Sequence, residues 1–374
     1  MTLRFTTTAT DGAARCGLVE TPRGRFTTPC FMPVGTRGSV KGLSSADLEA
    51  LGVEVTLANA YHLMLRPGAE VVAGMGGIHR FTAWSGHVLT DSGGYQVLSL
   101  AARVDDDGVT FRSTYDGSTH RLTPERAVAV QGLLGADIQM ALDVCPPLSS
   151  PPGLLRQAVE RTVAWGVRAR DAHRREGREG QALFGIVQGG IDERLRAESA
   201  RRTVELDLSG YAIGGLSVGE SRSEMLAALA PTVAELPGDR PRYLMGVGDP
   251  VGLAEAVALG ADMFDCVLPT RLARHGTALT AAGPLRLRNA TFAQDAEPID
   301  PTCPCDVCGR WSRAYLRHQL VVGEASARRL ITMHNLAWIL ALVARIRAAV
   351  RAGTLTALRA ELANRWAHLP AASQ

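Results

Sequence analysis

The sequence has little lysine and little net charge. Lys41 is the only lysine among 40 lysine and arginine residues, and the formal net charge is +3. A charge this small does not by itself indicate a nucleic-acid partner. Arginine is nevertheless frequent from Arg271 onward, and guanidinium groups bind phosphate in a bidentate manner. This part of the chain is therefore either an RNA-facing side or a solvated surface of biased composition.

The sequence also lacks a long apolar segment and a disulfide framework. Its longest apolar run, LAWILALVA at 336–344, ends at Arg345 and is too short to span a bilayer. The first residues, MTLRFTTTATDG, contain no apolar core of a signal peptide. The seven cysteines are an odd number, and three of them lie within 303–308, which is unlike a secreted protein. We therefore expect a protein without a membrane segment, in a reducing cytoplasm.

The pattern of apolar residues is that of a parallel α/β protein. With 374 residues, 46% of them hydrophobic and 21% charged, the chain can form one large domain and a small appendage. Short, continuously apolar runs indicate buried parallel strands. The runs that end at a polar residue or a glycine are 87–90, 138–142, 183–187, 211–213, 243–245 and 263–264.

Longer amphipathic segments separate these runs. Thr123 and Pro124 are a typical N-cap and first helical residue, and further helices are predicted at 154–173, 192–206, 221–236 and 251–260. Alternating strands and helices predict either a (β/α)8 TIM barrel or a doubly wound open sheet. We favour the barrel, because polar residues follow many different strands and a barrel gathers those strand ends at one mouth. No G-x-G-x-x-G motif follows an early strand.

A cysteine cluster near the C-terminus predicts a metal site. Cys303, Cys305 and Cys308 form a C-x-C-x2-C pattern, followed by His318 and His334. Three thiolates and one imidazole form a closed tetrahedral shell that zinc favours, so the zinc would be structural. We prefer His334 as the fourth ligand because it begins an apolar run that can dock as a helix. Residues 275–290 are predicted to form two strands joined by an Ala-Gly-Pro turn, so that about 275–335 is a zinc-binding insertion in a single catalytic domain, 1–374.

Three aspartates stand at or near predicted strand ends, namely Asp91, Asp143 and Asp265. A lone aspartate in such a place is usually a helix cap or a loop hydrogen-bonding group, but several would face one barrel mouth. Cleavage of a glycosidic bond with retention needs a carboxylate nucleophile and an acid/base group, and Asp265, among apolar neighbours, suits the nucleophile. The groups that suit recognition of a purine-like base along its edge and faces are Asp143, Gln188, the Gly215 amide, Tyr95 and Met245. This set fits many base-handling enzymes.

Longer motifs select one family among them. The chain resembles the bacterial tRNA-guanine transglycosylases from about Arg4 to the helix after His334. The motifs that carry the resemblance are FMPVGTRGSVKGL (31–43), NAYHLMLRPG (59–68), LTDSGGYQV (89–97), GIVQGG (185–190), YAIGGLSVGE (211–220), YLMGVGDP (243–250) and ADMFDCVLPTRLARHG (261–276), together with the cysteine and histidine set.

The resemblance implies a homodimeric barrel enzyme with one zinc per subunit. It implies that Asp265 attacks C1′ of the wobble nucleotide and that Asp91, with Asn59 or Ser92 nearby, is the general acid/base. The base-binding residues implied are Ser92, Gly93, Gly94, Tyr95, Asp143, Gln188, Gly215, Leu216 and Met245. The residues implied to bind the anticodon loop are Gly246, Val247, Gly248, Asp249, Pro250, Thr270, Arg271, Leu272, Ala273 and Arg274.

The implied reaction is a step of queuosine biosynthesis. Guanine in the GUN anticodons of the tRNAs for Asp, Asn, His and Tyr would be exchanged for preQ1 (7-aminomethyl-7-deazaguanine). Cys145 and Val218 are typical of the preQ1-using type. Val144, Leu148 and Ala58 depart from the family pattern, and the first two, which are expected to border the base pocket, leave queuine open as the incoming base. The chain could also be a tRNA-binding paralogue without activity, which would lack the Asp91 and Asp265 pair, or a barrel glycosidase.

Overall fold

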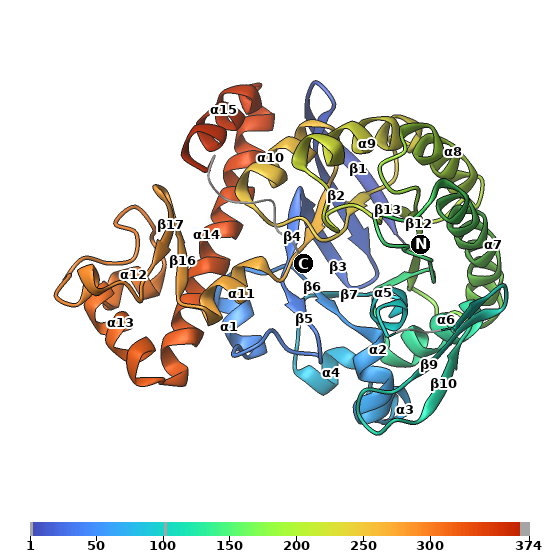
Figure 1. The fold of residues 1–374 in the computed structure, drawn as a ribbon, viewed down its shortest axis with the longest axis horizontal. Helices are drawn as coiled ribbons and strands as arrows, with labels where there is room; N and C mark the ends of the chain where they lie inside the picture. Colours follow the sequence, from blue (N-terminus) through green and yellow to red (C-terminus); the bar gives the residue numbers. More distant parts are fainter. Residues whose placement is uncertain (1–2, 101–102, 367–374) are drawn as a thin grey trace.

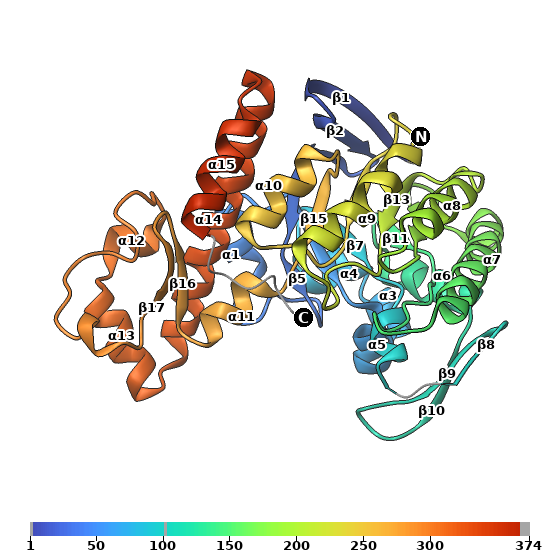
Figure 2. The same cartoon turned by 45° about the horizontal axis from the view of Figure 1, so that its top comes forward.

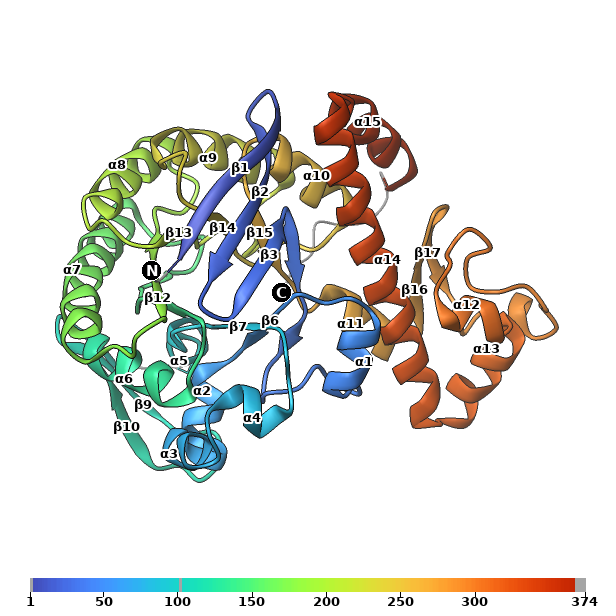
Figure 3. The same cartoon turned by 180° about the vertical axis from the view of Figure 1, so that it is seen from behind.

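The N-terminal segment forms a small sheet across one end of the molecule. The computed structural model describes residues 3–100 and 103–366. Within them, β1 (Arg4–Asp11), β2 (Ala14–Thr21) and β3 (Gly24–Thr28) are antiparallel, and Figure 3 shows them lying over the barrel. Phe5, Val19 and Phe26 are buried in the same cluster as the side chains that fill the barrel. The sheet therefore plugs this end of the barrel with apolar side chains.

The centre of the molecule is a closed parallel barrel. Its strands are β4 (Cys30–Met32), β5 (Val34–Gly35), β6 (Val55–Ala58), β7 (His87–Thr90), β11 (Ile138–Met140), β12 (Ala182–Val187), β13 (Gly210–Ile213), β14 (Arg242–Leu244) and β15 (Met263–Asp265). The first piece, β4, pairs with β15, and the second piece, β5, pairs with β6. Only Pro33 separates the two pieces, and proline has no N–H for a strand ladder.

These two pieces together fill one of eight strand positions, and all the pairings around the ring are parallel. The (β/α)8 prediction is confirmed, and the open sheet is excluded. All six strands predicted from apolar runs lie in the barrel, as β7, β11, β12, β13, β14 and β15.

Helices surround the barrel (Figure 1). They are α1 (Ser45–Ala50), α2 (Ala60–Leu63), the π-helical η1 (Met64–Gly68), α3 (Ala69–Gly74), α4 (Ile78–Thr82), α5 (Gly94–Leu98), α6 (Pro124–Leu134), α7 (Pro152–Glu176), α8 (Glu193–Val204), α9 (Arg222–Glu235) and α10 (Pro250–Ala258). The predicted start of α6 is confirmed, since the Thr123 side chain accepts a hydrogen bond from the Arg126 amide. The other four predicted helices agree with α7 to α10 to within three residues at each end.

A second antiparallel sheet was not anticipated from the sequence. It consists of β8 (Arg103–Asp105), β9 (Gly108–Arg112) and β10 (Thr119–Leu122), between α5 and α6, and it projects from one side of the barrel (Figure 2). Its strands are short and mostly polar, so no apolar run marks them. Val109 and Phe111 alternate along β9, and Leu122 lies opposite Val109 on β10. These three side chains are buried in one cluster with Trp165 of α7.

The chain then forms a helical lobe on the opposite side of the barrel (Figures 1 and 2). Its elements are α11 (Leu268–Arg274), β16 (Thr277–Thr280), β17 (Gly283–Arg286), the 3-10 helix η2 (Ala290–Phe292), α12 (Asp306–Arg310), α13 (Arg313–Val322) and the first part of α14 (Ala325–Ala352). The last helix, α15 (Leu355–Trp366), packs against α10 and belongs to the main core around the barrel. The predicted hairpin is present, but its turn is not Ala-Gly-Pro. Gly283 already pairs with Thr280, so the turn is Ala281-Ala282.

The long helix α14 joins this lobe to the barrel. Within the described residues, it is the one helix long and apolar enough to cross a membrane, but half of its apolar window is buried in the protein. It contacts β1, β2 and β4 at the barrel and α11, α12, α13 and β16 in the lobe. The apolar run at 336–344 therefore belongs to a core helix.

A buried ion pair fixes the N-terminal sheet to the barrel. Arg15 of β2 donates from Nε and Nη2 to the Asp262 carboxylate, at 2.8 and 2.6 Å, and the Arg242 amide donates to the same carboxylate at 2.7 Å. Arg15 is 5% exposed and Asp262 is fully buried. Removal of one member of such a pair leaves a buried charge without its partner.

We predict that Asp262→Ala lowers the free energy of unfolding by about 3–5 kcal/mol, because the Arg15 guanidinium loses its counter-ion. Asp239→Ala is the control, since Asp239 pairs with Arg240 at the surface with 71% of its side chain exposed, and exposed pairs contribute about 0–1 kcal/mol. Urea unfolding of the two variants and the wild type gives the comparison. Equal losses in the two variants would contradict the prediction.

Candidate functional site

The carboxyl ends of the barrel strands surround one cavity of about 230 Å³. Residues from the ends of β5, β6, β7, β11, β12, β13, β14 and β15, or from the loops that follow them, form its wall. These include Thr36, Asn59, Asp91, Ser92, Asp143, Gln188, Gly215, Met245 and Asp265. All three aspartates singled out in the sequence therefore face the same space.

One oxygen of Asp265, at the end of β15, is held by two donors. Its Oδ1 accepts hydrogen bonds from the Tyr243 hydroxyl at 2.6 Å and from the Gly246 amide at 2.9 Å. Among the described residues, no hydrogen bond reaches Oδ2. Burial raises the pKa of Asp265, and the two hydrogen bonds oppose that rise. The carboxylate is thus fixed at one oxygen and leaves the other for a ligand in the cavity.

Asp91 follows β7 and is also anchored at its carboxylate. Its Oδ1 accepts from the amides of Ala60 (2.8 Å) and Gly93 (3.2 Å), and its Oδ2 accepts from Asn59 Nδ2 at 2.6 Å. Burial raises the pKa of Asp91 to about 7, and the negative charges of Asp265 and Asp143 add to the rise while the backbone hydrogen bonds oppose it. Asp91 therefore exists in both protonation states near neutral pH, which suits a group that gives and takes a proton. The predicted contact between Asn59 and Asp91 is present.

A second buried polar pair lies deeper in the cavity. Asp143 accepts a hydrogen bond of 2.6 Å from Gln188 Nε2, and the two side chains are 7% and 1% exposed. Burial raises the pKa of Asp143 to about 6, although the Gln188 bond lowers it. Gln188 Oε1 is buried and has no donor among the described residues. An unpaired buried acceptor is costly, so this edge of the cavity suits a ligand that donates hydrogen bonds.

Glycines shape the wall beside this pair. Gly215 has a φ of +67°, and a Cβ there would lie 2.3 Å from Gln188 Oε1. Gly93, with φ +77°, and Gly94 follow Asp91, and a Cβ on Gly94 would lie 3.1 Å from Asp143 Oδ1. Ser92 lines the cavity, and its hydroxyl accepts from the Gly94 amide; among the described residues it donates no hydrogen bond to Asp91. The chain therefore needs glycine where its backbone approaches the polar edge.

Two large side chains line the same cavity as the polar groups. Tyr95, on α5, is 46% exposed although it is aromatic, and Met245 follows β14. Both line the cavity, and so does Leu216. An exposed aromatic ring and a flexible thioether in one cavity are suited to a flat ligand.

The residues predicted to bind RNA lie next to this cavity. Gly246 gives its amide to Asp265, and Asp249 caps α10 through the Gly252 amide and pairs with Arg222. Residues 246–250 are buried as a group, and Gly246 lines the cavity. In α11, Thr270 and Ala273 are buried, whereas Arg271, Leu272 and Arg274 are partly exposed.

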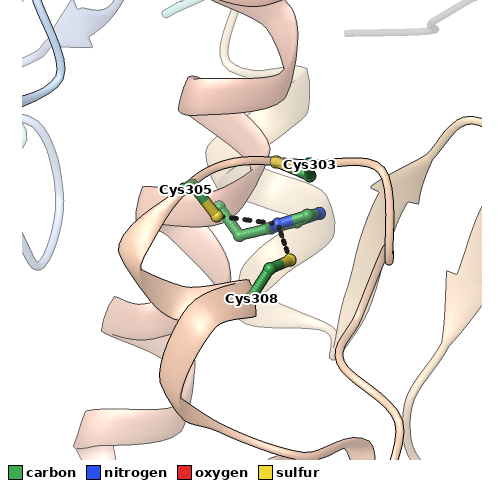
Figure 4. Close-up of side chains that lie close together, drawn as sticks. Cys303, Cys305 and Cys308 are labelled. Carbon is green, nitrogen blue, oxygen red and sulfur yellow. Dashed lines mark hydrogen bonds between the residues drawn. The ribbon is translucent and has the colours of Figure 1, made fainter.

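The predicted metal ligands meet in the helical lobe. Ligand atoms of Cys303, Cys305, Cys308 and His334 all lie within 4.8 Å of one another, and Figure 4 shows the three cysteines around one ring nitrogen. That nitrogen is His334 Nδ1, at 3.4 Å from Cys305 Sγ and 3.3 Å from Cys308 Sγ. His318 is exposed on α13 and is not part of the cluster.

The donor set fits zinc. The other ring nitrogen of His334, Nε2, lies 2.7 Å from the Leu279 carbonyl oxygen, so Nε2 carries the proton and Nδ1 presents its lone pair to the cluster. Sulfur and nitrogen ligands about 2.3 and 2.1 Å from a tetrahedral zinc are separated by about 3.6 Å, which agrees with the observed contacts. Four protein ligands leave no coordination position for a substrate, so a zinc here would hold α12 and the loop before it against α14.

Several contacts of the site could not be predicted from the sequence. The sequence does not show that Tyr243 donates to Asp265, because Tyr243 sits in an apolar run that predicts only a strand. Arg196 of α8 is fully buried and donates to the Gly214 carbonyl at 2.8 Å, but in the sequence it is one arginine among several. Both depend on packing between segments far apart in the chain.

Comparison with known proteins shows the family of this chain. The family model for queuine tRNA-ribosyltransferase matches residues 10–368. The chain belongs to the queuine tRNA-ribosyltransferase family. Relatives of that name include one from Pelotomaculum thermopropionicum, 50% identical over 98% of this chain and 99% of the relative. Another, from Sphingopyxis alaskensis, is 49% identical over 97% and 98%, and one from Thermus thermophilus is 50% identical over 97% and 94%. The resemblance found in the motifs is thus confirmed.

We predict that the purified protein contains about one zinc per chain and that Cys305→Ala removes it, because three ligands hold zinc far less tightly than four. Cys16→Ala is the control, since Cys16 is buried against α14 at the Arg347 carbonyl and is not in the cluster. Elemental analysis after dialysis gives the zinc content of each protein. Retention of zinc by Cys305→Ala would refute the ligand assignment.

Proposed function

We propose that this protein is a tRNA-guanine transglycosylase that exchanges guanine at the wobble position of GUN anticodons for preQ1. The observation that carries the proposal is that Asp265 and Asp91 line one cavity of base size, each anchored by hydrogen bonds and each with a raised pKa. Family membership and the polar edge formed by Asp143 and Gln188 support a purine-like base as the ligand.

The first half of the proposed reaction breaks the bond between guanine and ribose. Asp265 Oδ2 attacks C1′ of the nucleotide, the C1′–N9 bond breaks, and the leaving N9 takes the proton of neutral Asp91. The product is an ester between Asp265 and the RNA. The Tyr243 and Gly246 hydrogen bonds keep Oδ1 in place, so the attacking oxygen has a fixed direction.

The second half reverses these steps with a new base. Ionised Asp91 removes the N9 proton of the incoming base, N9 attacks C1′, and the ester to Asp265 breaks. Two inversions at C1′ give net retention. Each half regenerates the protonation state of Asp91 that the other half needs, and one glycosidic bond replaces another, so the cycle requires no ATP.

The polar edge would recognise what guanine and preQ1 share. Asp143 and Gln188 Oε1 are acceptors, suited to the N1–H and 2-amino groups, and the Gly215 amide would donate to the 6-oxo group. Tyr95 and Met245 would lie on the two faces of the ring. The Leu216 carbonyl would accept from the aminomethyl group of preQ1, which guanine lacks.

We favour preQ1 over queuine because Cys145 and Val218, which are typical of the preQ1-using type, line both this cavity and the neighbouring one. Val144 does not oppose this, because its side chain packs in an apolar cluster with Val97 and Trp165 and does not line the cavity. Leu148 lines the neighbouring cavity. Competition between preQ1 and queuine for one tRNA measures the preference directly.

The zinc, the partners and the location complete the proposal. The cysteine and histidine cluster would hold one structural zinc, tRNA would be the macromolecular substrate, and the enzyme would act as a homodimer in the cytoplasm. Arg271 and Arg274 would take part in holding the anticodon loop, since both are partly exposed next to the cavity. Incubation with radiolabelled guanine and a GUN tRNA tests the activity, because a non-catalytic paralogue would bind the tRNA without incorporating label.

We predict that Asp265→Asn reduces guanine exchange by at least about a thousandfold and forms no covalent RNA adduct, since an amide is a poor nucleophile. Denaturing gels of enzyme mixed with tRNA show the adduct, and label incorporation gives the rate. Asp239→Asn, at the opposite end of the barrel, should behave as the wild type in both assays. A covalent RNA adduct formed by Asp265→Asn would show that another residue is the nucleophile.

The pKa of Asp91, about 7, predicts opposite pH profiles for the two half-reactions. Adduct formation needs neutral Asp91, so its rate should fall as the pH rises through about 7. Release of the adduct by incoming base needs ionised Asp91, so its rate should fall as the pH drops through the same value. Single-turnover measurements from about pH 5.5 to about pH 8.5 give both profiles. Flat profiles, or profiles unchanged in Asp91→Asn, would contradict this role.

A further inference from the structure

Two arginines share one tyrosine ring beside the cavity. The guanidinium carbon of Arg66 lies 4.7 Å from the centre of the Tyr115 ring, and that of Arg37 lies 5.3 Å from it. The Tyr115 hydroxyl is 2.9 Å from His62 Nδ1, and His62 lines the cavity with Asn59 and Asp91. A continuous chain of contacts therefore connects the two arginines to the cavity wall.

These residues come from three separate parts of the chain that meet at the cavity. Arg37 lies in the loop after β5, next to the cavity residue Thr36. Arg66 follows α2, the helix that carries His62. Tyr115 belongs to the turn between β9 and β10 of the projecting sheet. The sheet that sequence analysis did not anticipate thus supplies the ring on which both arginines lie.

The positive charges of Arg37 and Arg66 have no carboxylate partner among the described residues. Within residues 3–100 and 103–366, neither Arg37 nor Arg66 forms an ion pair with a carboxylate, and both are exposed. Each guanidinium is attracted by the ring, and each keeps N–H donors that can bind phosphate oxygens.

The cavity itself needs positive charge nearby if its ligand is a nucleotide within RNA. Its wall carries three carboxylates, Asp91, Asp143 and Asp265, which repel a phosphate backbone. Arg37 is close enough to His62 in the wall to lower the pKa of that imidazole, although burial lowers it more. The positive potential of Arg37 therefore reaches the cavity.

From this geometry we infer that Arg37 and Arg66, positioned by Tyr115, bind a backbone phosphate of RNA beside the nucleotide whose base enters the cavity. The inference rests on the proposed function, because it takes RNA as the substrate. The ring holds both guanidinium groups beside the cavity wall, and guanidinium groups recognise phosphate oxygens in a bidentate manner. The site is separate from the arginines of α11.

The test is RNA binding by the full-length protein as a function of salt. The probe is an anticodon stem-loop with a GUN anticodon, and the variant is Arg37→Ala with Arg66→Ala. We expect its Kd to rise by about tenfold at low salt. The slope of log Kd against log salt should fall by about 0.7 to 0.9, because one phosphate is no longer neutralised by the protein. In exchange assays, KM for the RNA should rise while KM for free guanine stays unchanged.

Three further variants separate this site from general charge effects. Arg25→Ala removes an exposed arginine of β3 at the plugged end of the barrel and should leave Kd unchanged. Tyr115→Ala should weaken RNA binding because the ring is lost, whereas Tyr115→Phe keeps the ring and should bind RNA as the wild type does. Thermal unfolding of the variants shows that they remain folded.

A neutral probe identifies the ligand as an RNA phosphate. Stem-loops that carry one methylphosphonate at a time near the wobble nucleotide should include one that binds the wild type about tenfold more weakly but binds the double variant with no further loss. A double variant with wild-type Kd and salt slope, or one no weaker than Arg25→Ala, would overturn the inference. So would competition by inorganic phosphate at this site without any effect of the methylphosphonates. Binding is measured without turnover, so failure of the exchange reaction would refute the proposed function and not this site.

Discussion

Closure of the barrel at Pro33 is the constraint on which the rest of the structure depends. The strand on either side of this residue pairs in two directions, β4 with β15 and β5 with β6. Around the ring, β15 and β7 are separated only by this split strand and by β6. An open sheet broken at Pro33 would place β15 and β7 far apart, and with them Asp265 and Asp91. The closed ring instead brings both carboxylates into one cavity.

Much of this arrangement can be predicted from sequence because parallel barrel strands are buried on both faces. Their residues form short apolar runs that need no alternation, and a polar residue directly after such a run has to lie at the mouth. Asp91 and Gln188 follow the strands β7 and β12 directly, so strand assignment alone placed them. The cysteine and histidine cluster could be predicted as well, since three thiolates within six positions and one imidazole are a ligand set that zinc favours.

The rest depends on contacts between distant segments. The projecting sheet has too few apolar residues to mark its strands, yet it brings Tyr115 to Arg37 and Arg66. The hydrogen bond from Tyr243 to Asp265 joins neighbouring strands, and the apolar sequence of neither strand predicts it. The pKa of Asp91 is raised by burial and by two other carboxylates in the cavity. Neither cause can be predicted from the residues next to Asp91 in the sequence. Sequence therefore indicates which groups meet, whereas their ionisation and orientation follow from tertiary packing.

The helix α14 has two functions at once. Near its start it carries His334 of the metal cluster, and beyond that point Leu336, Ile339 and Val343 pack into the main core around the barrel. Oxidation of the cluster cysteines would therefore loosen the amino-terminal end of a helix whose remainder supports β4. Because β4 belongs to the strand that closes the ring, this oxidation would lower the amount of folded enzyme. It would not slow the chemical step itself.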